Sequence, residues 1–242
     1  MPRGQPDYGL TAQTVLAAGI ADPGEAAARL GSINVYDRRG WTLWMDNFEA
    51  PALKWEAASF GGGIVPVLDS SRAWTGAQSV KLACPAAGAP ISQLYRCFPL
   101  ARLGKVGAEF WIQTNQVVGS YIRFLLGIYD GVNLSSAEME YYPQLGTIRL
   151  ATSVGWILVA SDIYMTQAGQ YFLPIKLVVD MDTEQFIRLL VGEREIDISS
   201  YLMFNAGATV FRVIGVILAL YGVAGGATEA YIDNFILTVS EP

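Results

Sequence analysis

Short apolar segments separated by turn residues dominate the chain from Trp41 onward. Several alternate apolar and polar residues with the two-residue period of a half-buried strand, whereas residues 121–129 are apolar on both faces, as in a central strand. Many short strands without an intervening helical pattern are typical of an antiparallel sandwich or barrel. The predicted strands are residues 43–49, 78–84, 92–99, 107–114, 121–129, 135–142, 146–152, 156–161, 174–181, 185–191, 194–198, 210–220 and 230–239.

Two segments also predict how neighbouring strands connect. Residues 146–160 form two apolar runs around Val154-Gly155, which predicts a hairpin. Residues 175–198 predict three consecutive strands that turn at Asp182-Thr183 and Gly192-Glu193. These connections favour antiparallel pairing between strands that follow one another in the chain.

Residues 1–40 have little strand pattern and contain one predicted helix, at residues 22–30. The helix has an N-cap residue, a proline at its first position, an acidic partner for the cap and a glycine stop at Gly31. A helix this short is marginal alone in water, so we expect it to dock on the body of the protein or on a neighbouring subunit. The chain therefore divides into an arm, residues 1–40, and a β-domain, residues 41–242. The residues expected to make the arm an assembly element are Asp22, Pro23, Glu25 and Leu30.

Composition and charge narrow the possible partners. Apolar residues make up 52% of the chain and charged residues 16%, which favours a large core and leaves apolar surface for oligomerisation. The net charge is −6, and the largest basic cluster is the pair Arg38-Arg39. Nucleic acid and anionic membranes are therefore disfavoured as partners, because both require a basic surface. The uncharged residues 213–228 are too few for a membrane helix and favour a buried strand with its turn.

The chain contains no histidine and only two cysteines, Cys84 and Cys97. Without histidine, a Ser-His-Asp or Cys-His catalytic set and a histidine-ligated zinc are excluded. Two cysteines cannot form a zinc site, and we expect buried thiols, with a cross-strand disulfide as the alternative. Any enzymatic chemistry would have to use carboxylates, tyrosine or lysine.

The tripeptide Asp-Asn-Phe occurs twice, at residues 46–48 in "WMDNFE" and at residues 233–235 in "YIDNFIL". Together with "SRAWTGAQSVKL" at residues 71–82, these segments resemble the frame of concanavalin-like and carbohydrate-binding-module domains over residues 43–240. The resemblance implies a jelly-roll β-sandwich whose first and last strands lie side by side. The repeated tripeptide would then mark these two strands.

The N-terminal segment, with "RGQPDYG" and "DPGEAAARLGSINVYDRRGWTLWMDNFE", resembles uncharacterised phage-type virion structural proteins. This resemblance implies a jelly-roll body that works in an assembled particle. Our first hypothesis is therefore a non-catalytic structural protein of a virus particle, either a capsid decoration or a tail-associated component. Its partners would be copies of itself and other virion proteins, and its location the virion or, alternatively, the extracellular space.

Two alternatives use side chains of the β-domain. A carbohydrate-binding module or lectin-like domain would stack sugars on exposed aromatic rings, and Trp74 and Tyr142, both near turns, are the best candidates. A glycosidase or lyase would need two carboxyl groups, and Glu138 and Glu140 lie about 7 Å apart on one face of a strand. This segment lacks the third acidic residue of sandwich-fold glucanases, so we expect the chain not to be an enzyme.

A structural calcium ion is the one cofactor that the sequence suggests. If the first and last strands pair, Asp46, Glu49 and Asp233 offer carboxylate oxygens near one another, and calcium prefers oxygen ligands. The alternative role for Asp46 and Asp233 is to accept hydrogen bonds from neighbouring backbone N–H groups. A second acidic cluster, at residues 180–184, has the spacing of an ordinary hairpin turn.

Overall fold

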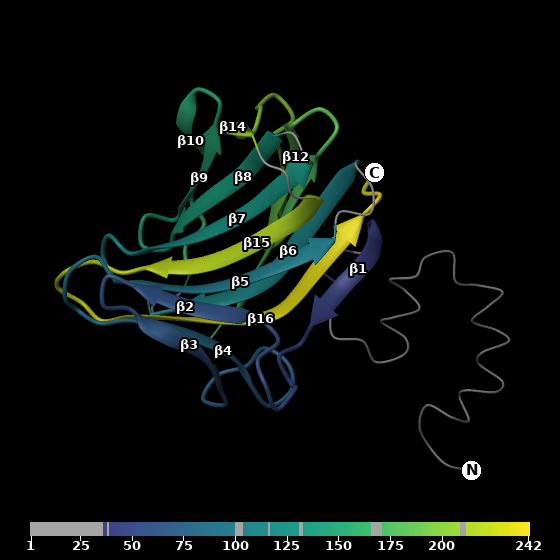
Figure 1. Cartoon of the computed structure of the whole chain (residues 1–242). Coiled ribbons are helices and arrows are strands. Elements are labelled where there is room, and N and C mark those ends of the chain that lie inside the picture. The colour runs from purple at the N-terminus through teal and green to yellow at the C-terminus, as the bar shows by residue number, and fades with distance from the viewer. Residues whose placement is uncertain are drawn as a thin grey trace, which may run out of the picture.

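Two antiparallel sheets, stacked face to face, form the protein in this computed structural model (Figure 1). The structure describes residues 36–37, 39–99, 104–115, 117–130, 133–165, 171–208 and 212–242. These residues contain strands and no helix, so the all-β jelly-roll sandwich is confirmed. Among the described residues, no helix is long and apolar enough to span a membrane. The predicted helix at 22–30, with Asp22, Pro23, Glu25 and Leu30, lies outside the described residues.

Sheet A has the order β13-β12-β11-β6-β16-β4-β3, and β1 also pairs with β16. Sheet B has the order β10-β9-β8-β7-β15-β5-β2, and β14 also pairs with β8. The strands are β1 (Trp41–Asp46), β2 (Glu56–Phe60), β3 (Ile64–Asp69), β4 (Ser79–Cys84), β5 (Ile91–Pro99), β6 (Lys105–Thr114), β7 (Tyr121–Asp130), β8 (Asn133–Tyr142), β9 (Thr147–Thr152), β10 (Gly155–Ala160), β11 (Leu173–Asp180), β12 (Gln185–Val191), β13 (Arg194–Asp197), β14 (Phe204–Ala208), β15 (Arg212–Tyr221) and β16 (Thr228–Val239).

The sequence pattern finds most of these strands and both predicted connections, the β9–β10 hairpin and the β11–β12–β13 meander. It misses β2, β3 and β14. β2 consists largely of small residues, β3 contains Pro66, and β14 contains Gly207, so each departs from the pattern of a typical strand. β2 and β3 lie at the edges of the two sheets, where such sequences are tolerated.

The core lies between the sheets and is filled from both inner faces. Phe110 of β6 and Phe124 of β7 meet across it with ring centroids 5.1 Å apart. Tyr141 is fully buried, and its hydroxyl donates a hydrogen bond to the Ile163 carbonyl at 2.9 Å. Because alternate residues of each strand fill this core, the intervening residues face outward and are available for other roles.

The two copies of Asp-Asn-Phe are neighbours in space, as the sequence predicts. β1 pairs antiparallel with β16, and this register places Asp46 opposite Phe235. Phe48 and Phe235 are both buried in the core. Each aspartate accepts a local hydrogen bond: Asp46 from the Phe48 N–H at 3.0 Å, and Asp233 from the Asn234 N–H at 2.8 Å.

The cysteines are both free thiols. Cys84 is buried, as expected, but Cys97 is exposed. The expectation of two buried thiols is thus wrong for Cys97, because β5 directs alternate residues away from the core and residue 97 belongs to the outward set.

A cavity of about 440 Å³ lies at one end of the sandwich, where Leu43, Val106 and Ile214 are among the lining residues.

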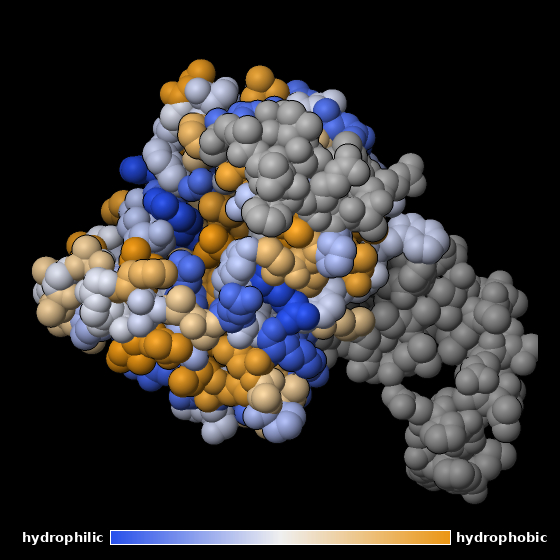
Figure 2. Space-filling view, viewed as in Figure 1, coloured by the Kyte–Doolittle hydropathy of each residue, from blue (hydrophilic) through white to orange (hydrophobic). Residues whose placement is uncertain are grey.

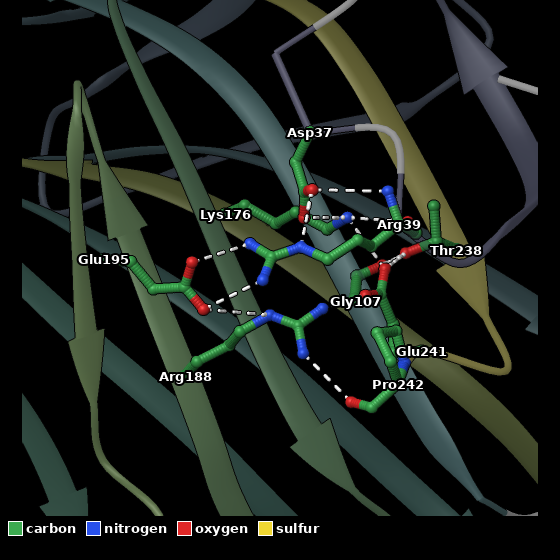
Figure 3. Close-up of polar contacts among 9 residues, drawn as sticks. All are labelled: Asp37, Arg39, Gly107, Lys176, Arg188, Glu195, Thr238, Glu241 and Pro242. Carbon is green, nitrogen blue, oxygen red and sulfur yellow. Dashed lines mark hydrogen bonds and ion pairs between the residues drawn. The ribbon is translucent and has the colours of Figure 1, made fainter. Parts of the chain in front are cut away.

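A buried charge network fastens the segment before β1 to the outer face of sheet A (Figure 3). Lys176 of β11 is fully buried, and its Nζ lies 2.8 Å from Asp37 Oδ2 and 2.7 Å from Glu241 Oε1. Arg39 forms a bidentate ion pair with Glu195, at 2.9 and 3.0 Å, and Arg188 contacts Glu241. The network joins residues near both ends of the described chain across β11, β12 and β13.

Glu109 of β6 lies beside this network and is 1% exposed. The network already matches the cations Lys176, Arg39 and Arg188 with the anions Asp37, Glu195 and Glu241. An ionised Glu109 would add a further negative charge to those of the three acidic side chains in this described network. Burial, opposed in part by Lys176, raises the pKa of Glu109 to about 8.

We predict that Glu109→Gln weakens the pH dependence of stability. Glu109 has a higher pKa in the folded chain than the ordinary value of about 4.3, so the folded state binds its proton more tightly and loses stability as pH rises through this range. Glutamine cannot ionise. Relative to wild type, the variant should gain roughly 2 kcal/mol in unfolding free energy between about pH 5.5 and pH 7.5. Urea denaturation at both pH values measures this difference.

The matched control is Glu56→Gln, at an exposed position of β2. Its effect on the unfolding free energy should be the same at both pH values. If Glu109→Gln behaves in the same way as this control, Glu109 is ionised throughout the range and the prediction is wrong.

Candidate functional site

Three tyrosines form a ladder across the outer face of sheet B, one each from β15, β7 and β8. Tyr221 stacks on Tyr121 with ring centroids 4.6 Å apart and planes 7° apart. Tyr142 lies on the other side of Tyr121 at 5.0 Å. Tyr221 and Tyr121 are directly opposite each other in the β15–β7 pairing. The sheet register therefore positions the ladder, and we call these three residues the tyrosine ladder.

Arg123 lies next to the tyrosine ladder and joins it to two carboxylates of β8. It is opposite Glu140 in the β7–β8 register, and its Nε lies 3.2 Å from Glu140 Oε1. Its Nη1 lies 4.0 Å from Glu138 Oε2 and donates to the Tyr221 hydroxyl at 3.5 Å. The guanidinium also lies 4.7 Å from the centroid of the Tyr221 ring. Arg123 thus makes ionic, hydrogen-bonding and cation–π contacts at once.

The two carboxylates lie on one face of β8, as predicted, but their environments differ. Glu140 is 5% exposed, and it binds Arg123 and accepts a hydrogen bond from the Tyr142 hydroxyl at 2.8 Å. Burial, followed by this hydrogen bond, raises the pKa of Tyr142 to about 12. Glu138 is half-buried and accepts a hydrogen bond from Ser136 Oγ at 3.1 Å. Glu140 is therefore held on both sides, whereas Glu138 is the more accessible carboxylate.

Trp156 supplies the exposed aromatic surface of this face. It is 43% exposed and lies opposite Ala151 in the β9–β10 hairpin. Its ring centroid is 5.4 Å from the Arg123 guanidinium, although β8 and β9 separate the two strands. The small side chain of Ala151 leaves the space in which the indole and the guanidinium approach each other.

Arg149 adds a second cation beside the carboxylates. Its guanidinium lies 5.1 Å from the centroid of the Tyr142 ring, and within the described residues it has no hydrogen bond or ion pair. Further along this face, Gly127 and Gly215 lie opposite each other on β7 and β15. The face thus combines an exposed indole, phenol hydroxyls, carboxylates and guanidinium groups on rigid strands. Such groups can bind a polyhydroxylated ring by stacking and by hydrogen bonding.

The two aromatic residues predicted to bind carbohydrate do not belong to one site. Tyr142 lies on the outer face of sheet B, in the tyrosine ladder. Trp74 lies over the outer face of sheet A, where it stacks on Trp111 of β6 at 4.4 Å. A single site containing both side chains is therefore ruled out, because the full thickness of the sandwich separates the two faces.

The three residues suggested for calcium bind backbone N–H groups. Asp233 Oδ2 accepts hydrogen bonds from Trp74 at 2.8 Å and Thr75 at 3.2 Å, while Asp46 accepts one from Phe48. Glu49 Oε1 accepts hydrogen bonds from the N–H groups of residues 77 and 78. Among the residues that the structure describes, no group of three acidic or cysteine side chains is placed to hold a metal ion. The calcium ion stays a prediction.

Sequence analysis missed three residues of this face, Tyr121, Arg123 and Tyr221, and it preferred Trp74 and Tyr142 to Trp156 among the aromatic candidates. The segment "YIRF" places Tyr121 and Arg123 on the same face of a strand, which is a usable signal. However, Tyr221 comes from a strand almost 100 residues later, as the separation of 98 between Arg123 and Tyr221 shows. Only the order and register of the strands reveal that these side chains meet.

Similar solved structures share this fold. The chain has a TM-score of 0.54 to a protein of unknown function with a galectin-like fold from Bacillus subtilis, with 13% identity over 83% of this chain and 96% of that one. It has a TM-score of 0.50 to a GH16 protein of a Bacteroides ovatus mixed-linkage glucan PUL in complex with a product, with 13% identity over 81% and 99%. No protein-family model and no curated protein matches the chain.

A sialidase has a TM-score of 0.50, with 10% identity over 69% of this chain, and this chain spans only 16% of the sialidase. These likenesses show the fold, namely a concanavalin-like or galectin-like jelly roll, and they do not show a virion context. The expectation that the chain is not an enzyme is contradicted, because glycosidases share its fold. The absence of histidine excludes histidine chemistry only, and glycosidases use carboxylates.

We predict that Arg123→Met destabilises the protein. The substitution leaves the buried Glu140 carboxylate without its cation, and breaking such a pair is costly. Because Arg123 is itself partly exposed, we expect a loss of about 2 kcal/mol in unfolding free energy. Urea denaturation measures it. The double variant Arg123→Met with Glu140→Met should recover much of the loss, since no charge is then left unpaired.

Arg149→Met is the matched control, since it removes an exposed arginine of the same face that has no ion pair. Its effect should stay within about 0.5 kcal/mol. Equal losses for the two arginine variants would show that the Arg123–Glu140 pair has no special role in stability.

Proposed function

We propose that this protein binds carbohydrate on the outer face of sheet B. The observation that carries the proposal is the exposed Trp156 ring beside the polar network of Arg123, Glu138 and Glu140. The apolar C–H face of a pyranose ring stacks on an indole, while its hydroxyls pair with carboxylates and guanidinium groups. Both kinds of group stand within reach of one another on this face.

The face is organised before any ligand arrives. Its side chains come from adjacent strands of one sheet, and stacking and ion pairs restrict the rotamers of the tyrosine ladder and of Arg123. A binding site whose side chains are already ordered loses less conformational entropy when the ligand binds. This is the advantage of a sheet face over mobile loops for holding a polar, weakly hydrophobic ligand.

The virion hypothesis has a different basis. It depends mainly on the resemblance of the N-terminal segment to phage-type virion structural proteins. Most of that segment lies outside the described residues, which begin at residue 36. Carbohydrate binding is supported by side chains that the structure describes and by likeness to a fold that includes carbohydrate-active proteins. We therefore prefer carbohydrate binding and keep assembly through the arm as a separate prediction.

A second candidate function is hydrolysis of a glycosidic bond. The observation that favours it is the unequal environment of Glu138 and Glu140, because a glycosidase uses two carboxyl groups in different roles. Glu138, the more accessible carboxyl group, would act as the general acid, and Glu140, which is paired with Arg123, would be the second carboxyl group that such a reaction needs. Release of reducing sugar from an oligosaccharide, abolished by Glu138→Gln, would establish this activity.

We predict that Trp156→Ala lowers carbohydrate affinity at least about tenfold, which corresponds to about 1.4 kcal/mol of lost stacking. Isothermal titration calorimetry with neutral β-linked glucose, galactose and mannose tetrasaccharides, and with a uronic-acid tetrasaccharide, measures the affinity. The variant should keep its fold, because the indole is exposed. Circular dichroism checks this.

Trp41→Ala is the matched control, since Trp41 is also an exposed indole, at 63%, but lies on β1 of sheet A. Its affinity should equal that of wild type. If all tetrasaccharides bind Trp156→Ala as well as wild type, or if none binds wild type, the proposed site is wrong.

A further inference from the structure

A second group of aromatic side chains lies on the outer face of sheet A, opposite the proposed site. Trp74 stacks on Trp111 with ring centroids 4.4 Å apart and planes 12° apart. Trp74 is 45% exposed, whereas Trp111, Phe172 and Tyr231 are buried beneath or beside it. Trp74 therefore presents part of an indole to solvent on a firm aromatic base.

The loop that carries Trp74 is fixed by two carboxylates. Asp233 Oδ2 accepts hydrogen bonds from the Trp74 and Thr75 N–H groups, at 2.8 and 3.2 Å. Glu49 Oε1 accepts two more, from Ala77 at 2.9 Å and Gln78 at 3.1 Å. Four N–H groups between residues 74 and 78 are thus bound to the sandwich. The position of the indole is therefore set before any ligand binds.

Three polar atoms close to this stack have no hydrogen-bond partner among the residues that the structure describes. The side-chain amide nitrogen and oxygen of Gln113 and the indole nitrogen of Trp111 are buried without a hydrogen bond. Gln113 is 1% exposed, belongs to the same outward face of β6 as Trp111, and lies opposite Tyr231 in the β16–β6 register. Buried polar atoms in native proteins nearly always have a partner, so this cluster offers hydrogen-bonding groups that a ligand can use.

We propose that the Trp74–Trp111–Gln113 group is a second carbohydrate site, which takes a pyranose ring with a flat C–H face. The ring would stack on Trp74, and its hydroxyls, which both donate and accept, would pair with the amide of Gln113. Because this amide is buried in the free chain, a covering side chain must turn aside as the sugar enters. This inference shares the ligand class of the proposed function but depends on separate residues.

Two sites on opposite faces would let one molecule hold two glycan chains. The group on sheet B is reached from one side of the sandwich, and Trp74 from the other, so one sugar chain need not exclude a second. Two sites that hold neighbouring chains of one polysaccharide raise the overall affinity through effective concentration. The protein would then cross-link a soluble polysaccharide, which a single site cannot do.

Calorimetry with a β-1,4-linked glucose tetrasaccharide tests the proposal, since all hydroxyls of its inner rings are equatorial. The experiment uses full-length Trp156→Ala, in which the sheet B site is disabled. Binding should persist in this variant and fall at least tenfold when Trp74→Ala is added. The control addition, Trp41→Ala, should leave binding unchanged.

Gln113→Leu separates a ligand contact from a structural role. It removes two unpartnered polar atoms, so the midpoint of thermal unfolding should rise while affinity at the second site falls at least tenfold in the Trp156→Ala background. Unchanged affinity in Gln113→Leu, or in Trp74→Ala, overturns the second site. Absence of binding in Trp156→Ala also overturns the second site, and it leaves the sheet B site intact. If Trp74→Ala abolishes binding and Trp156→Ala does not, the sheet B site is overturned and the second site is supported.

Discussion

The pairing of β1 with β16 is the contact on which much of the sandwich depends. It joins the first strand to the last across almost the whole β-domain, with Asp46 opposite Phe235. The two tripeptides then place Phe48 and Phe235 in the core and leave Asp233 beside the Trp74 loop. One antiparallel contact therefore sets the end of the core and the position of a surface loop together.

Two residues near this pairing have a strained backbone conformation. Phe48 has φ of 57° and Asn234 has φ of 48°, values in the left-handed region that non-glycine residues seldom adopt. The N–H groups of Phe48 and Asn234 donate hydrogen bonds to the carboxylates of Asp46 and Asp233, and these bonds stabilise both positions. Burial, opposed by three backbone hydrogen bonds, raises the pKa of Asp233 to about 6, so this carboxyl group favours the folded state in acid, and that contribution is lost as the pH rises through about 6. The two copies of the tripeptide thus differ in geometry: the left-handed residue is Phe48, after β1, in the first copy and Asn234, at the irregularity within β16, in the second.

Hydrophobic periodicity, a local signal, was sufficient for the all-β class, whereas the jelly-roll frame and the adjacency of the two Asp-Asn-Phe segments followed from the resemblance to concanavalin-like and carbohydrate-binding-module domains. It was insufficient for the candidate site. Residues 121–129 are apolar on both faces, so their pattern does not say which face carries Tyr121 and Arg123. Tyr221 reaches them only through the order of β15 and β7 in sheet B, which no local pattern encodes. Nor could the sequence say that the two candidate aromatic residues, Trp74 and Tyr142, lie on opposite faces of the sandwich.

The side chains on the two outer faces contribute less to folding than the core does, so their arrangement is informative about function. A sandwich is stabilised mainly by its inner faces, so aromatic and charged side chains on the outer faces are not needed for the core. On sheet A, the charge network and the Trp74 loop cover much of the outer face and bury its polar groups. On sheet B, the tyrosine ladder and Arg123 stay half-buried beside an exposed indole. Ordering long polar side chains there costs conformational entropy that core packing does not offset. This ordered and partly exposed polar surface supports the carbohydrate site that we propose on sheet B.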